Sequence, residues 1–232
     1  DWGADVIRVE MPAAMGMEVM GADRHGYESQ NLHRNKRSVT LNLKTEEGKA
    51  VFFDLVKDAD VIVENFRSEV KFRLGIDYES VRKVNPRLVY GSISGFGQTG
   101  PYANKPGFAR IFEAMSGLAY ITGDPDRSPM HNGYPIGDAI GGLTACNAVL
   151  MALLGRERGN TKGGEEIDLS LTEATFRLLD SMTIQYDQLG EEPQRTGNAS
   201  HYSAPANVFK TSDDQYVSLS GSTQATFIGN AK

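Results

Sequence analysis

Residues 39–66 read VTLNLKTEEGKAVFFDLVKDADVIVENF, and this stretch decides the fold class. Residues 39–43 alternate apolar and polar side chains, which predicts a strand. Thr45 can cap a helix whose first turn carries two acids, and apolar residues at 51, 52, 55 and 56 give that helix one apolar face. Residues 60–64 predict a second strand. A strand, a helix and a strand at this spacing indicate an open, mostly parallel sheet.

The pattern continues on both sides of this stretch. Residues 6–9 predict a short buried strand, whereas three glycines break any periodicity in residues 11–38, which we therefore expect to be loop. Two short helices at 70–74 and 78–84 precede a strand at 88–94. We predict an α/β, Rossmann-like open parallel sheet with helices. Such sheets bind ligands beyond the carboxyl ends of their strands, where residues 65–67 and 94–100 lie.

The second half of the chain predicts helices at 108–117 and 138–154, a strand at 166–171 and a helix to about 189. Residues 190–206 are polar and rich in Gly, Pro and Asn, which is typical of a linker. Residues 208–210 and 216–220 predict a hairpin. We expect a large domain over 1–189, a linker over 190–206, and the beginning of a smaller, truncated domain over 207–232. The chain lacks an initiator Met, so we expect a piece of a longer protein.

Composition excludes several classes of protein. The formal net charge of -6 argues against nucleic acid, because phosphate backbones need a basic surface. A single cysteine, Cys146, permits no intrachain disulfide and fits a cytoplasmic location. The first residues lack the basic start and apolar core of a signal peptide, so we expect none, and no apolar run reaches the roughly 20 residues of a membrane span. We expect neither a nucleic acid nor a membrane as partner.

Residues 95–100 match G-x-G-x-x-G, but Pro101 follows where a dinucleotide site needs a helix to begin. The acid expected about twenty residues later is also missing. The histidines at 25, 33, 131 and 201 are scattered, and one cysteine cannot build a zinc cluster. We therefore expect no nicotinamide, flavin or metal.

Asp138 stands between glycines just before an apolar helix, in the segment GYPIGDAIGG over residues 133–142. One interpretation is that Asp138 is merely a helix N-cap. The other is that its carboxylate is a nucleophile, with room around it and backbone amides that stabilise developing charge. Basic residues bracket the early strands and either form a solvated face or hold a phosphorylated ligand. They are Arg34, Lys36, Arg37, Lys44, Lys71 and Arg73.

As a set, several segments resemble the class III CoA-transferases (CaiB/BaiF, formyl-CoA transferase-like). These segments are GADVIRVE at 3–10, NKRS at 35–38, VENFR at 63–67, NPRL at 85–88, SISGFGQTGPY at 92–102, AMSG at 114–117, PIGD at 135–138 and DLSL at 168–171. The resemblance implies a CoA-binding large domain that lacks its N-terminal strand and helix here. It also implies, for the intact protein, a homodimer of interlocked subunits.

The resemblance also implies the chemistry. Asp138 corresponds to the catalytic aspartate, which forms an aspartyl anhydride and then an aspartyl-CoA thioester while CoA passes from an acyl-CoA to a carboxylic acid. The implied coenzyme A contacts are Leu41, Lys44, Asn65, Phe66, Arg73, Lys105 and Phe108. One further contact position, often basic in the family, is Met11 here, which weakens the expected affinity for CoA.

Two alternatives remain beside a transferase. The fold also includes 2-methylacyl-CoA racemases, but their catalytic histidine in a G-H-D segment is replaced here by Gly107-Phe108-Ala109. A non-catalytic CoA-binding fragment is the other alternative. The acids exchanged cannot be read from the sequence, although dicarboxylic acids are plausible donors or acceptors.

Overall fold

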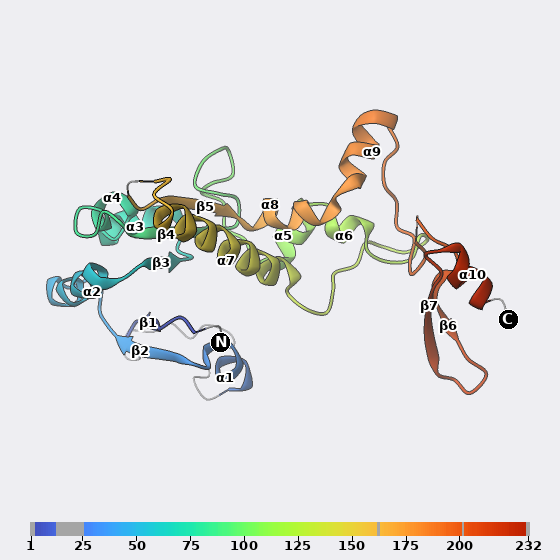
Figure 1. The fold of residues 1–232 in the computed structure, drawn as a ribbon, viewed down its shortest axis with the longest axis horizontal. Helices are drawn as coiled ribbons and strands as arrows, with labels where there is room; N and C mark the ends of the chain where they lie inside the picture. The colour runs from blue at the N-terminus through green and yellow to red at the C-terminus, as the bar shows by residue number, and fades with distance from the viewer. Residues whose placement is uncertain (1–2, 13–25, 162, 201, 231–232) are drawn as a thin grey trace. The chain divides into compact units, whose positions relative to one another are not determined.

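The computed structural model describes residues 3–12, 26–161, 163–200 and 202–230. The chain divides into two compact units, each gathered from segments far apart in the sequence (Figure 1). Unit 1 comprises Asp1–Ile62, Glu69–Tyr90 and Ala152–Glu166. Unit 2 comprises Val63–Ser68, Gly91–Met151 and Ile167–Lys232. The predicted domain boundaries at 189 and 206 stay a prediction.

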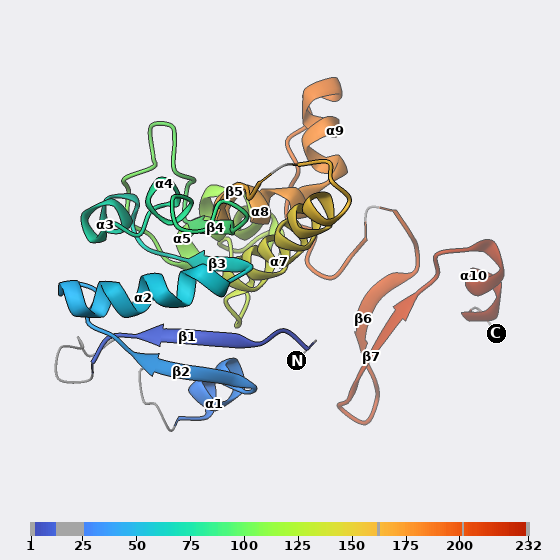
Figure 2. The same ribbon diagram turned by 60° about the vertical axis from the view of Figure 1, so that its left-hand side comes forward.

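The strands confirm the α/β fold class. β1 (Val6–Glu10) and β2 (Lys36–Thr40) run parallel, with Val6 opposite Lys36 (Figure 2). A three-stranded sheet has the order β3 (Val61–Glu64), β4 (Val89–Ser94), β5 (Glu166–Ser170). β6 (Ala206–Lys210) and β7 (Tyr216–Ser220) form the predicted antiparallel hairpin. The strands expected in one open sheet are thus divided between a two-stranded and a three-stranded sheet.

The strand predicted at 39–43 lies three residues earlier, at β2. A turn at Asn42 follows the strand: the Asn42 carbonyl accepts from the amide of Thr45 at 3.1 Å, and its side chain accepts from the amide of Lys44 at 3.1 Å. The prediction of loop over 11–38 was also wrong in part, since α1 (Tyr27–His33) lies within it. The glycines at 16 and 21 fall outside the described residues.

α2 (Glu46–Asp58) confirms the helix predicted from its N-terminal signals. The Thr45 hydroxyl accepts from the amide of Gly48 at 3.2 Å. The apolar face of α2 buries Phe52 and Val56 in the core of unit 1. The other buried members of that cluster are Ile76, Val81, Leu88 and Tyr90.

Most of the remaining helices lie in stretches that the sequence predicted to be helical. In unit 1 and at its border lie α3 (Ser68–Leu74) and α4 (Tyr78–Val81), the latter ending three residues before its predicted end. α5 (Ala109–Met115), α7 (Ile136–Glu157), α8 (Leu171–Phe176) and α9 (Ser181–Leu189) occupy predicted helical stretches. The short η2 (Arg177–Leu179) lies within the helix predicted to about 189, whereas α6 (Leu118–Ile121) and α10 (Gln224–Asn230) were not predicted.

Within the described part of the chain, α7 alone is long and apolar enough to cross a membrane by length and composition. The same test is passed by core helices of soluble proteins, and α7 carries Asp138 in its first turn. Length and composition therefore do not assign α7 to a membrane.

Candidate active site

The first turn of α7 sets the position of Asp138. The carbonyl of Pro135 accepts from the amide of Ala139 at 3.2 Å, and the helix begins at Ile136. Asp138 is therefore the third helical residue, and the interpretation of this residue as the N-cap is wrong. A carboxylate in the first turn of a 22-residue helix faces the positive end of the helix dipole.

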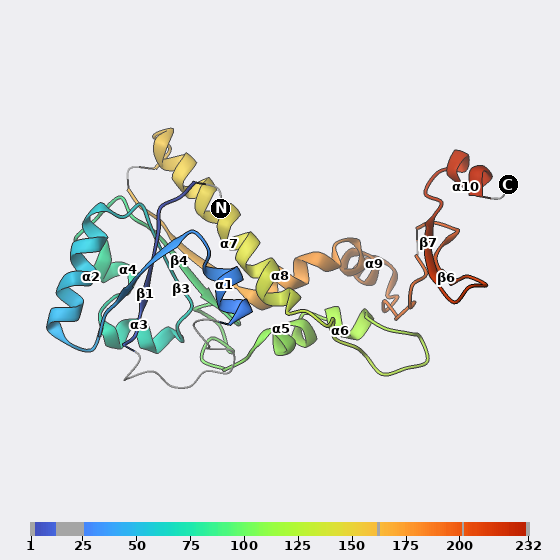
Figure 3. The same ribbon diagram turned by 90° about the horizontal axis from the view of Figure 1, so that it is seen from below.

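The glycines around Asp138 serve different purposes. A Cβ on Gly137 would lie 3.4 Å from the carbonyl of Ala109 and 3.4 Å from the hydroxyl of Thr175. A Cβ on Gly141 would lie 2.0 Å from Leu171 Cδ2. A Cβ on Gly137 would thus make ordinary van der Waals contacts, whereas a Cβ on Gly141 would clash, so Gly141 lets α7 approach α8 closely (Figure 3). Gly133 and Gly142, in contrast, have open space where a Cβ would be, which fits the expected room for a reacting group.

Asp138 itself is exposed, and its carboxylate makes no hydrogen bond or ion pair with any residue that the structure describes. Partial burial of the carboxyl group, and in second place the negative charge of Glu113, raise the pKa of Asp138 above its ordinary value. A carboxylate with neither a structural partner nor an ordinary pKa is a candidate for chemistry.

Glu113 is a residue of this site that the sequence analysis missed. It lies on α5, and its side chain is only 2% exposed. One carboxylate oxygen accepts from the amide of Gly137 at 3.3 Å, and the other lies 3.0 Å from Nδ1 of His131. A signal existed, because Glu113 interrupts an otherwise apolar run, but the sequence does not show that this position is buried.

A second buried acid shapes the loop after β3. Glu64 accepts from the amide of Phe66 at 2.7 Å and from the hydroxyl of Ser92, which lies on the neighbouring strand. Asn65 and Phe66 consequently project from a fixed turn, and both are exposed. This is the loop that the sequence analysis placed at a ligand-binding strand end.

The glycine loop at residues 95–100 is held by β5 and the helix after it. Both carboxylate oxygens of Asp168 lie 3.0 Å from the amide of Gln98, and the hydroxyl of Thr172 donates to the carbonyl of Gly95 at 2.8 Å. Gly97 has a φ of +84°, which favours glycine. Turns rather than a helix follow Gly100, so the loop has no helix N-terminus to offer a pyrophosphate.

The predicted CoA contacts divide between the two units. Unit 2 contains Asn65, Phe66, Lys105 and Phe108 together with Asp138, and all of them are exposed. Phe108 is 86% exposed at the N-cap of α5, and the Lys105 ammonium lies 4.0 Å from the centroid of the Tyr102 ring.

Unit 1 contains Leu41, Lys44 and Arg73. Lys44 and Arg73 are exposed, whereas Leu41 packs partly buried against the core cluster. No group of three or more His, Cys, Asp or Glu side chains with the arrangement of a metal site occurs among the described residues.

A family model described as CoA-transferase family III matches residues 1–229. The chain is 38% identical to succinyl-CoA–D-citramalate CoA-transferase of Chloroflexus aurantiacus, over 98% of this chain and 57% of that protein. It is 39% identical to acetyl-CoA:oxalate CoA-transferase of Acetobacter aceti, over 95% of this chain and 57% of that protein.

A solved structure of the same family shares the fold of this chain. The CaiB/BaiF family protein from Brucella suis superimposes with a TM-score of 0.81 at 36% identity, covering 92% of this chain and 58% of that one. The chain therefore spans little more than half the length of the relatives it matches. With a match over residues 1–229 and this shared fold, the chain belongs to CoA-transferase family III.

Proposed function

We propose that the protein is a CoA-transferase, which moves CoA from an acyl-CoA donor to a carboxylic acid with Asp138 as the nucleophile. The observation that carries the proposal is the exposed Asp138 carboxylate in the first turn of α7, without a partner among the described residues. The chain's membership of CoA-transferase family III supports the same reaction class.

In the first half of the reaction, the Asp138 carboxylate attacks the thioester carbonyl of the donor. The C–S bond breaks, CoA leaves as a thiolate, and a mixed anhydride joins Asp138 to the donor acyl group. The thiolate then attacks the aspartyl carbonyl of the anhydride. The donor acid leaves as a carboxylate, and an aspartyl-CoA thioester remains.

The second half reverses these steps with another acid. The acceptor carboxylate attacks the aspartyl thioester and expels the CoA thiolate, which gives a new anhydride. The thiolate attacks the acyl carbonyl of the acceptor, so that acyl-CoA leaves and the Asp138 carboxylate is restored. Each step exchanges one activated acyl group for another, and no proton is gained or lost overall.

The CoA contacts are proposed from the family resemblance and from exposure. Lys44 and Arg73 are exposed cations that suit the nucleotide phosphates, with Leu41 beside the adenine. Asn65 and Phe66 lie on the turn that Glu64 holds and would follow the cofactor along the strand end.

Lys105 and Phe108 would contact the pantetheine arm. Phe108 leaves most of its ring surface uncovered, which is costly in water and is relieved when an apolar chain binds against it.

Trapping of the covalent intermediate tests the nucleophile. The full protein that carries this sequence is incubated with succinyl-CoA and then with hydroxylamine, and peptide mass spectrometry locates the modified residue. We expect the label on Asp138, and Asp138→Asn should abolish it. The matched control Asp126→Asn changes an exposed carboxylate in a turn and should keep the label. A label elsewhere, or none, contradicts the proposal and favours a non-catalytic CoA-binding protein.

The substrates are proposed to be dicarboxylic acids and their CoA thioesters. The names of similar proteins mention succinyl-CoA with D-citramalate, acetyl-CoA with oxalate, and succinate with glutarate. Measuring CoA exchange from succinyl-CoA to a panel of mono- and dicarboxylic acids checks this class. Faster exchange with monocarboxylic acids would contradict it.

We further propose a cytoplasmic homodimer. Three apolar side chains of α7 in unit 2, Leu143, Leu150 and Met151, are 57–73% exposed, as is common where another subunit binds. Sedimentation of the full protein should give twice the monomer mass. A monomer at micromolar concentration would contradict the dimer.

A further inference from the structure

Glu113 is a carboxylate in a place that ordinarily excludes charge. Its side chain is 2% exposed, and its neighbour Phe112 is 3% exposed in the same helix. A carboxylate taken out of water costs several kcal/mol unless it is hydrogen-bonded or paired. The hydrogen-bond partners of Glu113 therefore indicate the role of this buried carboxylate.

Both partners lie on the segment that leads into α7. As a carboxylate, Glu113 can only accept hydrogen bonds, so the Gly137 amide donates to Oε1 and the His131 ring donates from Nδ1 to Oε2. One side chain thus holds the chain at residue 131 and again at residue 137. The amide of Gly137 directly precedes Asp138, and fixing it fixes the backbone from which the Asp138 side chain projects.

Glu113 also acts on Asp138 through its charge. It is the one charged group that raises the pKa of Asp138 among the described residues, after partial burial of the carboxyl group itself. Three other charged or titratable groups lie on the adjoining elements, namely Arg110 on α5, Glu173 on α8 and His131 on the loop. None of the three contributes to that shift.

We propose that Glu113 is a positioning residue for Asp138: it holds the first turn of α7 through the Gly137 amide and places a second negative charge beside the attacking carboxylate. This inference rests on the proposed function, in which Asp138 is the nucleophile. A more basic carboxylate, in its ionised form, attacks a thioester carbonyl more readily.

Two substitutions separate the two roles. Glu113→Ala removes the acceptor and the charge, whereas Glu113→Gln keeps an oxygen for the Gly137 amide and removes only the charge. We measure the single-turnover rate of Asp138 adduct formation from succinyl-CoA against pH, in the full protein. Glu113→Ala should lower the rate at neutral pH by about tenfold or more, because misplacement of a reacting group is costly. Glu113→Gln should restore most of that loss.

The pH profile carries the second readout. Asp138 must be ionised to attack, so the rate falls as pH drops through its raised pKa. Without the charge of Glu113 this pKa moves back toward its ordinary value, and the acidic limb of the Glu113→Gln profile should shift to lower pH. A residue with a purely structural role would leave that limb unmoved.

Glu173→Gln is the matched control, since Glu173 is an exposed acid in the first turn of α8. Glu173→Gln should change neither the single-turnover rate nor the pH at which the acidic limb of the profile falls. Wild-type rates in Glu113→Ala, or an unmoved limb in Glu113→Gln, would overturn the inference while the Asp138 label persists. Absence of the label in the wild type would instead remove the proposed function and this inference with it. Should Glu113→Ala fail to fold, the limb of Glu113→Gln still decides.

Discussion

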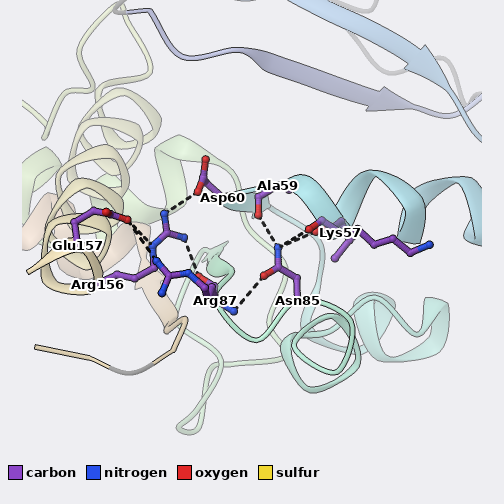
Figure 4. Close-up of polar contacts among 8 residues, drawn as sticks. Lys57, Ala59, Asp60, Asn85, Arg87, Arg156 and Glu157 are labelled. Atoms are coloured by element: carbon purple, nitrogen blue, oxygen red, sulfur yellow. Dashed lines mark hydrogen bonds and ion pairs between the residues drawn. The ribbon is translucent and has the colours of Figure 1, made fainter. Parts of the chain in front are cut away.

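Asn85 should be one of the most costly polar side chains to remove from unit 1. Its side-chain amide donates to the carbonyl of Val56 at 2.9 Å and to that of Ala59 at 2.8 Å, where α2 ends. Figure 4 shows Asn85 beside Ala59. Its oxygen accepts from the amide of Arg87 at 3.1 Å. The last carbonyls of a helix have no partner within the helix. Asn85 therefore satisfies the end of α2 from a segment 26–29 residues away.

The magnitude follows from these bonds. Each of the two short hydrogen bonds contributes about 0.5–1.5 kcal/mol net, and a half-buried carbonyl left unsatisfied adds to the cost. We expect Asn85→Ala to lower the free energy of unfolding by about 2 kcal/mol. For a chain of this size that corresponds to a fall in Tm of about 4–8 °C.

Urea unfolding followed by circular dichroism measures this loss, with thermal unfolding as the second probe. Asn160→Ala is the control, because Asn160 is exposed in the same unit and its side chain makes no hydrogen bond with the residues described. Asn85→Asp should be at least as unstable as Asn85→Ala, since a carboxylate cannot donate to carbonyls. A loss below about 0.5 kcal/mol for Asn85→Ala, or a stable Asn85→Asp, would refute the assignment of Asn85 as the donor.

Three further predictions concern Asp138, the packing of unit 1 and a proposed CoA contact. Asp138→Asn should raise Tm at neutral pH by no more than about 2 °C, because the exposed carboxylate is screened. The pKa of Asp138 is raised in the folded protein, which therefore binds the proton more tightly than the unfolded chain does. The stability from this proton is present below the ordinary pKa of Asp and is lost as pH rises through the raised pKa of the folded state. The gain in Tm from Asp138→Asn should therefore vanish in acid. Gly164→Ala should cost roughly 3 kcal/mol or more in urea unfolding, because its Cβ would lie 1.8 Å from the backbone carbonyl oxygen of Leu88. Arg73→Gln should raise the KM for acyl-CoA by about tenfold with kcat little changed, whereas Arg82→Gln, which removes an exposed arginine paired within its own turn, should leave KM unchanged.

Local signals in the sequence predicted the elements whose ends are fixed locally. α2 begins where Thr45 and two acids indicate, because the cap and the dipole act within one turn. β3 and β4 lie where short apolar runs predict them. These elements also bury the core of unit 1, so pattern and packing agree.

Elements set by distant contacts were misplaced. β2 carries the sequence KRSVT, whose first three residues are exposed, so it shows no apolar alternation. Its bounds come from pairing with β1, about 30 residues earlier in the chain. α1 has no buried residue and therefore gives no helical period to detect.

The same distinction explains why Asp138 was predicted and Glu113 was not. Glycines next to an acid can be recognised in the local sequence around Asp138. The contacts of Glu113, in contrast, are with residues 18 and 24 positions further along the chain, which the local sequence does not indicate. An isosteric amide at residue 113 would also accept from the Gly137 amide, so the geometry of α7 does not by itself require a charge there. Burying a carboxylate without need is unfavourable. Besides its contact with His131, the charge acts on Asp138, which is why the acidic limb of the Glu113→Gln profile, rather than the stability of that variant, decides the question.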